Sequence, residues 1–171
     1  MHASYDTGDG RPTLRFERRL AHPVEAVWNA ITEPSELKHW FPSKVEVDLR
    51  TGGEMAFKFE QMPLDAPSTM PGRVTDLDPP RVFAFYWGED HLRFELEPIP
   101  EGCLLRFTVA LDARDKAARD AAGWHVCLDA LERELERGEV TRPHPSEHWR
   151  EHYDEYARRG FPTGAPVPEK V

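Results

Sequence analysis

The stretch AAGWHVCLDALERELERGE, residues 121–139, decides the fold of this chain. It belongs to a longer run, residues 115–137, in which apolar residues recur at steps of three and four. At about 100° per residue, such positions share one narrow stripe of a helix, which we expect to end at Gly138. The members of this stripe are Ala117, Ala121, Trp124, Leu128, Leu131 and Leu135. A thinner stripe on the opposite face consists of Ala122, Val126 and Ala130. A helix that lies on a sheet needs only one apolar face, so the second stripe predicts that another segment covers its back.

The residues before this helix predict one strand, two short helices and then a series of strands. Residues 13–20, TLRFERRL, alternate as a strand does, whereas residues 22–31 have the helical period and residues 33–41 predict a second short helix. From residue 44 onward the period is two. The predicted strands cover residues 44–50, 54–60, 71–78, 81–87, 91–97 and 103–111. Turn residues separate neighbouring strands, which predicts an antiparallel meander.

These elements predict one α+β domain, residues 13–140. A curved antiparallel sheet is expected to wrap around the long C-terminal helix, while the two short helices after the first strand close one end. Residues 1–12 are rich in Gly, Asp and Ser and are expected to be a flexible N-terminus. Residues 141–171 are expected to be an extension with a short helix and a disordered tail.

The short helix of the extension is predicted over residues 145–159. Pro145 suits its start, and Gly160 ends it. Trp149, Tyr153 and Tyr156 would share one face. We expect this face to pack on the back of the long helix or against a partner chain.

Composition and charge exclude several classes of protein. The chain has 171 residues and a formal net charge of −9, with 39% hydrophobic and 31% charged residues, as expected of a single globular domain. It has no basic block, so neither nucleic acid nor an anionic membrane is an expected partner. No apolar run approaches the roughly 20 residues of a membrane span, and the N-terminus lacks the apolar segment of a signal peptide, so we expect a cytoplasmic protein. Cys103 and Cys127 are therefore expected to be thiols.

Four strings resemble a known family. They are AHPVEAVWNAITEPSELKHWFP (21–42), VDLRTGGEMAF (47–57), GRVTDLDPPRVFAFYWG (72–88) and the stretch at 121–139 quoted above. In this order they resemble the START-like helix-grip superfamily (SRPBCC), and within it the branch named after the activator of the heat-shock-protein-90 ATPase. The resemblance implies the helix-grip fold. Members of the superfamily bind lipids, hormones or polyketides, and some act as cyclases or hydrolases, but the resemblance carries over no catalytic residue set.

We predict a ligand cavity between the sheet and the long helix, because a curved sheet does not pack tightly against one helix along its whole width. The apolar residues predicted to line it are Trp124, Leu128, Leu131, Phe57, Phe94, Phe107 and Trp87. The alternative is a tightly filled core, since an apolar stripe is more often core than pocket.

Two polar residues are predicted to orient the ligand. His125 lies one step from Trp124, at the edge of the apolar stripe, where it could donate a hydrogen bond or titrate near neutral pH. The alternative is a bond to a backbone carbonyl. Arg18 breaks the apolar face of the first strand. If it points inward, it needs an acid, a water cluster or an anionic ligand group, because a buried unpaired cation is costly.

Three functions remain open at this point. The first is a protein that binds an apolar, lipid-like or polyketide-like small molecule, with no cofactor. The second is an enzyme of the cyclase or dehydratase kind that works in the same cavity, with His125 as the candidate acid or base. The third is a protein-interaction module of the co-chaperone kind, with a solid core and an exposed apolar patch. Residues 81–87 are apolar on both strand faces and could supply that patch or the edge of a homodimer.

The string HWREH, from His148 to His152, matches the inverted zinc-protease motif His-x-x-Glu-His. The two histidines could be ligands and Glu151 a base, but a catalytic zinc needs a third protein ligand. The acids that follow are Asp154, Glu155 and Glu169. Two of them lie on the same helix and one lies in the tail. We therefore interpret the motif as a solvated helix face, with Glu155 and Arg159 as an i, i+4 pair, and predict no bound metal.

Overall fold

The computed structural model of the chain describes residues 1–8, 10–60, 68–138 and 148–168. Its elements are, in chain order, β1 (Ser4–Asp6), β2 (Thr13–Leu20), α1 (Val24–Thr32), α2 (Pro34–Trp40), β3 (Lys44–Val47), β4 (Glu54–Lys58), β5 (Thr69–Asp78), β6 (Val82–Trp87), β7 (Asp90–Ile99), β8 (Gly102–Ala110), the 3₁₀ turn η1 (Arg114–Lys116), α3 (Ala117–Arg137) and α4 (Trp149–Arg158). The predicted order of elements from the first long strand to the long helix is confirmed.

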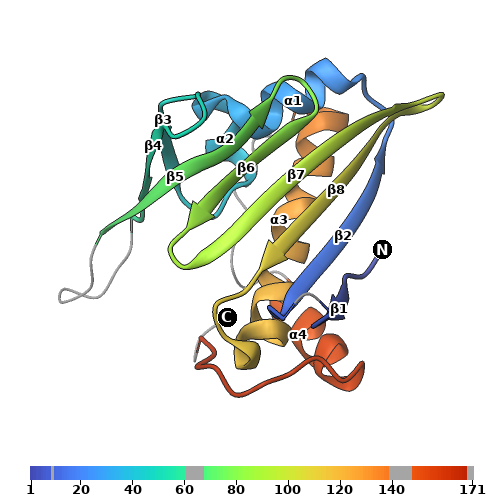
Figure 1. Cartoon of the computed structure of the whole chain (residues 1–171). Coiled ribbons are helices and arrows are strands. Elements are labelled where there is room, and N and C mark those ends of the chain that lie inside the picture. Colours follow the sequence, from blue (N-terminus) through green and yellow to red (C-terminus); the bar gives the residue numbers. More distant parts are fainter. Residues whose placement is uncertain (9, 61–67, 139–147, 169–171) are drawn as a thin grey trace.

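The strands form one eight-stranded antiparallel sheet, in the order β1-β2-β8-β7-β6-β5-β4-β3. From β3 to β8 each strand pairs with the next, as the predicted meander requires, and β2 pairs with β8. Figure 1 shows the sheet curving over α3, with α1 and α2 at one end of that helix. The α+β helix-grip architecture predicted from the sequence is therefore confirmed.

Strand alternation separates an apolar inner face from a charged outer face. Phe94 in β7 lies directly opposite Phe107 in β8, and the two buried rings stack with their centroids 4.3 Å apart. On the outer face, Arg106 forms ion pairs with Glu17 at 3.3 Å and with Glu97 at 2.8 Å. Arg106 precedes Phe107 in β8 and therefore points to the opposite face, which leaves the inner face to hydrophobic packing.

The direction of β6 could not be fixed from its sequence. In the structure Phe83 and Phe85 are buried in the core, and Trp87 shares their side of the strand. Tyr86 points the other way and is 41% exposed. Gly72 lies opposite Trp87 in the neighbouring strand β5, and a Cβ at Gly72 would lie only 2.5 Å from the Phe57 ring. Glycine at this position therefore allows the Phe57 ring to approach the backbone of β5 closely.

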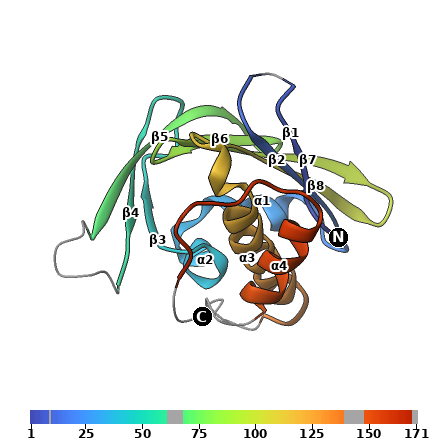
Figure 2. The ribbon, with the colours of Figure 1, turned by 90° about the horizontal axis from the view of Figure 1, so that it is seen from below.

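The long helix α3 ends as predicted at Gly138, whose φ of 63° is a left-handed conformation and whose N–H donates to the carbonyl of Glu134 at 2.8 Å. Both of its apolar stripes are buried, except for Leu135 in the last turn, which is half-buried. Figure 2 shows α4 lying beside α3. Trp149 and Tyr156 of α4 are buried against α3, so the prediction that a helix covers the second stripe is confirmed. No helix among the described residues is long and apolar enough to cross a membrane.

Both ends of the chain make hydrogen bonds with the domain. Residues 1–12 were expected to be flexible, but β1 pairs with β2 and the Ala3 N–H donates to the Tyr156 hydroxyl at 2.9 Å. The tail was expected to be disordered, but the Ala118 N–H donates to the Pro162 carbonyl at 3.0 Å. Phe161 is also buried. These contacts explain how segments without a periodic pattern are held in place. The rest of the predicted extension, residues 141–147 and 169–171, lies outside the described residues.

Candidate functional site

A cleft of about 280 Å³ opens beside the first turns of α3. Three tryptophans line it: Trp87 at the end of β6, Trp124 on α3 and Trp149 at the start of α4. We call this space the tryptophan cleft. Its polar lining residues are Asp90, Lys116, Arg119 and Asp120. Apolar walls with a few polar groups are the usual makeup of a small-molecule site.

Packing behind the cleft fixes the position of its aromatic walls. The Trp87 ring lies 4.6 Å from the Phe57 ring and 6.0 Å from the Trp124 ring, measured between centroids. The Trp124 ring in turn makes an edge contact with Phe107, at 5.2 Å. Trp149 lies against α3 at Gly123, which has no side chain. A Cβ placed at Gly123 would be 3.9 Å from the Trp149 Nε1. Two of the three walls therefore rest directly on the aromatic core.

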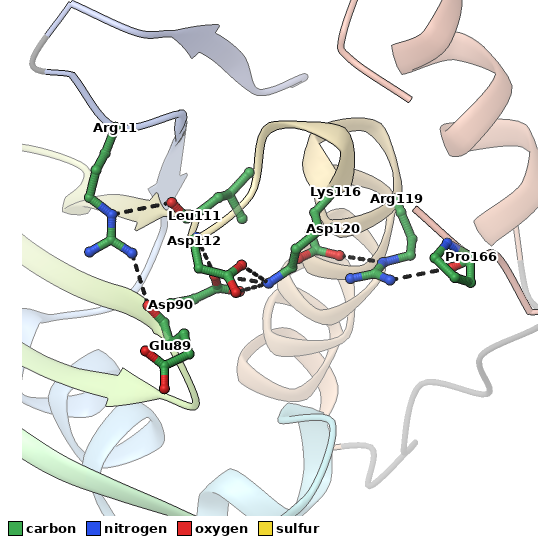
Figure 3. Close-up of polar contacts among 9 residues, drawn as sticks. All are labelled: Arg11, Glu89, Asp90, Leu111, Asp112, Lys116, Arg119, Asp120 and Pro166. Atoms are coloured by element: carbon green, nitrogen blue, oxygen red, sulfur yellow. Dashed lines mark hydrogen bonds and ion pairs between the residues drawn. The ribbon is translucent and has the colours of Figure 1, made fainter. Parts of the chain in front are cut away.

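The polar side of the cleft is a connected network, shown in Figure 3. Lys116 Nζ donates to both carboxylate oxygens of the buried Asp90, at 2.9 and 2.7 Å, and to Asp112 at 2.7 Å. The Asp112 N–H also donates to Asp90, at 2.8 Å. Burial alone would lower the pKa of Lys116, but the hydrogen-bonded carboxylates of Asp112 and Asp90 raise it. The ammonium group is therefore charged at neutral pH, and its charge is balanced within the network.

A second part of the network ties the C-terminal segment to α3. Arg119 Nε donates to Asp120 at 2.7 Å, and its NH1 donates to the Pro166 carbonyl at 3.3 Å (Figure 3). Arg11 closes the far end of the network, where it donates to the carbonyls of Leu111 and Glu89. The surroundings of the cleft are thus held by the Arg11 side chain from the N-terminal segment and by the Pro166 carbonyl from the C-terminal segment.

The structure separates the apolar residues predicted to bind a ligand into two groups. Trp87 and Trp124 line the tryptophan cleft. The others are at most 1% exposed and belong to the core: Phe57, Phe94, Phe107, Leu128 and Leu131. Aromatic rings from the sheet, from α2 and from the residue after α2 pack around them, as shown by Trp40 at 6.1 Å from Phe94 and Phe41 at 5.9 Å from Phe57. The described cleft lies at the end of this aromatic cluster and not within it.

The two polar residues predicted to orient a ligand do not line the tryptophan cleft. His125 is buried on another side of α3, and its Nδ1 lies 2.8 Å from the Tyr156 hydroxyl. A step of about 100° per residue is enough to turn His125 away from Trp124 and toward α4. Burial and the nearby His152 lower the pKa of His125 to about 3, so this imidazole is neutral at neutral pH.

Arg18 does point inward, and the acid that this direction requires is present. Its side chain is 5% exposed, and its Nε lies 2.8 Å from a carboxylate oxygen of Glu132 on α3. A second contact joins Arg18 to Asp129 at 3.5 Å. The arginine thus links β2 to α3 and is neutralised there, which leaves it no role at the tryptophan cleft.

Sequence reasoning missed Asp90, Lys116 and Trp149 as cleft residues. Asp90 and Lys116 lie at the ends of elements, where charged residues are usually solvated, and only the fold brings them together. Trp149 was assigned to the helix face that packs on α3, and it does pack there while also forming a wall of the cleft. For Trp149, the feature of the sequence that could have indicated a cleft residue is its place at the first position of α4.

The zinc-protease motif does not assemble. The side chains of His148 and Glu151 are 69% and 78% exposed and contact each other at 3.1 Å. His152 instead faces α3, where its ring stacks on His125 with centroids 3.9 Å apart. The predicted solvated face is confirmed for His148 and Glu151 and is wrong for His152. The predicted pair of Glu155 and Arg159 is present, with Arg159 donating to Glu155 at 2.8 Å.

Both cysteines are buried thiols, as predicted. Burial raises the pKa of Cys127, at the base of the tryptophan cleft, to about 12 and also raises the pKa of Cys103. Because the thiolate is the reactive form, we expect neither cysteine to react with Ellman's reagent in the folded protein in mildly alkaline buffer. Both should react after unfolding in guanidinium chloride. Rapid modification of one thiol in the folded protein would contradict the burial of Cys127 beneath the cleft.

Comparison with known proteins identifies the family. The family model described as Activator of Hsp90 ATPase homolog 1-like protein matches residues 21–136, well over half of the chain. The chain belongs to this family. A search of curated proteins finds no match. The matched residues include α1, α2, β3 to β8 and nearly all of α3, so they cover most of the grip but not α4.

Solved structures resemble this Hsp90-ATPase-activator-like domain in fold. A conserved protein of unknown function, EF2215 from Enterococcus faecalis, has a TM-score of 0.75 at 21% identity, with 92% of this chain and 89% of that chain covered. CalU16 from Micromonospora echinospora has a TM-score of 0.70 at 23% identity, with 91% and 94% covered. DynU16, a protein in the dynemicin biosynthetic locus, has a TM-score of 0.64 at 23% identity, with 75% of this chain and 48% of that chain covered.

Proposed function

We propose that this protein binds a flat, mainly apolar small molecule in the tryptophan cleft. The observation that carries the proposal is the set of three tryptophans, Trp87, Trp124 and Trp149, around one opening of about 280 Å³. Indole rings present large, rigid apolar surfaces at a low cost in conformational entropy. The volume lies just below the usual range for drug-sized ligands, which suits a small molecule of a few fused or linked rings.

The polar rim of the cleft favours a ligand without net charge. Its two cations, Lys116 and Arg119, are each paired with an aspartate, at 2.7 Å in both cases. An anionic ligand would have to displace these carboxylates, whereas a hydroxyl or carbonyl group could bond to the rim without disturbing it. We therefore expect a neutral ligand with one or two hydrogen-bonding groups at one end.

Binding is better supported than catalysis or protein interaction. The enzyme hypothesis relied on His125 as the acid or base, and its ring is turned to α4 and bonded to Tyr156. The interaction hypothesis needs an apolar surface patch. Among the described residues, the exposed large hydrophobic side chains are Met1, Leu49 and Tyr86. They come from separate parts of the chain: Met1 precedes β1, Leu49 lies between β3 and β4, and Tyr86 belongs to β6.

The proposal is tested by a thermal-shift screen with neutral aromatic compounds, lipids and polyketides, followed by titration of each hit against tryptophan fluorescence. The presence of DynU16, from a biosynthetic locus, among the structural neighbours is the reason to include polyketides. We expect the Trp87→Leu variant to bind a hit about 5- to 30-fold more weakly, because one aromatic wall is worth about 1–2 kcal/mol.

The matched control is Trp28→Phe. Trp28 is buried on α1 beside Phe83 and does not line the cleft, so this variant should bind the hit as the parent protein does. Equal losses in Trp87→Leu and Trp28→Phe would contradict the proposal, as would a screen in which no compound raises the melting temperature.

A further inference from the structure

Away from the tryptophan cleft, three side chains of types that can bind metals, His125, Asp129 and His152, lie together between α3 and α4. His125 Nε2 lies 3.7 Å from one oxygen of Asp129, and His152 Nε2 lies 3.9 Å from the other oxygen. One ligand atom from each of the three residues lies within 4.8 Å of the other two. Zinc ligands at about 2.0–2.2 Å in a tetrahedron lie roughly 3.4 Å apart. The group would close around an ion once the His152 ring turns out of its stack on His125, so that both Nε2 atoms point at the ion.

A contact outside the group fixes the orientation of His125, as is usual at metal sites. The Tyr156 hydroxyl contacts Nδ1 of His125 at 2.8 Å, which fixes the ring and leaves Nε2 directed at Asp129. Such an outer contact to the second ring nitrogen is found at nearly all histidines that bind metals.

The charges around the group also allow a cation. Arg18 approaches Asp129 at 3.5 Å, but its charge is already neutralised by Glu132 at 2.8 Å. The side chains of Asp129 and His152 are 38% and 21% exposed, so solvent reaches one side of the group. An ion bound there would have room for a water molecule as its remaining ligand.

We propose that His125, Asp129 and His152 form a binding site for a divalent transition metal, Zn²⁺ in the first place, that links α3 to α4. Two imidazoles and one carboxylate suit Zn²⁺, Ni²⁺ or Cu²⁺ and not Mg²⁺ or Ca²⁺. Asp129 follows His125 by one helical turn, and His152 comes from the neighbouring helix, so the ion would bridge the two helices. The site lies on the side of α3 away from Gly123 and Cys127, because two residues along a helix turn it by about 200°.

This site differs from the one that the sequence motif suggests. The motif pairs His152 with His148, whereas the structure pairs it with two residues of α3, and His148 is exposed with Glu151 as its neighbour. A second group of metal-binding side chains, Glu36, His39 and Glu134, lies elsewhere in the fold and has a single histidine. If the helix motif or the second group were the metal site, a different set of variants would lose metal binding.

The test is isothermal titration calorimetry of Zn²⁺ into the full-length protein without an affinity tag and free of cleft ligand. We expect saturable binding of one ion, with the affinity lowered by more than about tenfold in both Asp129→Asn and His152→Gln. These two positions are partly exposed, so the variants should fold, which circular dichroism would verify. Zn²⁺ should also raise the melting temperature of the parent protein, and Mg²⁺ should not.

His148→Ala and Glu36→Gln are the matched controls and should bind Zn²⁺ as the parent protein does. The inference is overturned if no saturable binding is found, or if Asp129→Asn and His152→Gln retain the parent affinity. Loss of binding in His148→Ala would also overturn it in favour of the helix motif, and loss in Glu36→Gln in favour of the second group. None of these results depends on whether the tryptophan cleft binds a ligand.

Discussion

Replacing Phe107 by alanine is expected to lower the free energy of unfolding by about 3–5 kcal/mol. The Phe107 ring is 1% exposed and contacts three other aromatic rings, among them Phe94 at 4.3 Å and Trp124 at 5.2 Å. Its removal would leave a void in a closely packed region, and such voids add to the loss of hydrophobic transfer free energy. Urea denaturation followed by circular dichroism would measure the change.

The same experiment separates a solid core from a hollow one. Leu49→Ala is the control, because Leu49 is 38% exposed and its truncation should change the free energy of unfolding by no more than about 0.5 kcal/mol. A Phe107→Ala loss below about 1 kcal/mol, with an unchanged denaturant slope, would mean that the ring lines a pre-existing cavity. The interior beneath α3 would then have to be regarded as the ligand site in place of the tryptophan cleft.

The second large effect is expected from a chain that ends at Gly138 and so lacks α4. The shortened chain loses the buried side chains of Trp149, Tyr156 and Phe161, each worth about 1.5–3 kcal/mol. It also leaves His125 and the Ala3 N–H without their hydrogen-bond partner, the Tyr156 hydroxyl. We expect the melting temperature to fall by about 10 °C or more, since 1 kcal/mol corresponds to about 2–4 °C in a chain of this size.

A substitution on the exposed face of α4 provides the control for the shortened chain. Glu151→Ala removes a side chain that is 78% exposed and should leave the melting temperature within about 2 °C of the parent value. An unchanged melting temperature in the shortened chain would mean that α4 does not stabilise the domain. The second apolar stripe of α3 would then need another explanation.

Local patterns in the sequence predict most of the fold because each element keeps one period. Strand alternation places Phe94, Phe107 and the inward Arg18 correctly, and the two stripes of α3 predict a covering helix. Pro and Gly residues mark the ends of the elements. Predictions of this kind succeed because each depends only on residues that are close together in the sequence.

The candidate site is predicted less well because it depends on contacts between distant elements. Periodicity does not tell whether an apolar side chain lines a cleft or fills a core, so Phe57 and Trp87 look alike in the sequence, although only Trp87 reaches the described cleft. The pairing of Asp90 with Lys116 joins the start of β7 to the turn before α3, and no local pattern signals it. His125 shows the same limit, since its partners come from α4.

The most direct test of the proposed cleft is a two-dimensional ¹H–¹⁵N NMR titration that follows the indole N–H signals of the five tryptophans. With a hit from the ligand screen, we expect the signals of Trp87, Trp124 and Trp149 to shift, because these rings line the cleft. The signal of Trp40, whose buried Nε1 donates to the Ala30 carbonyl at 2.8 Å, should stay in place together with that of Trp28. Shifts confined to Trp28 and Trp40, or an absence of shifts at saturating ligand, would contradict binding in the tryptophan cleft.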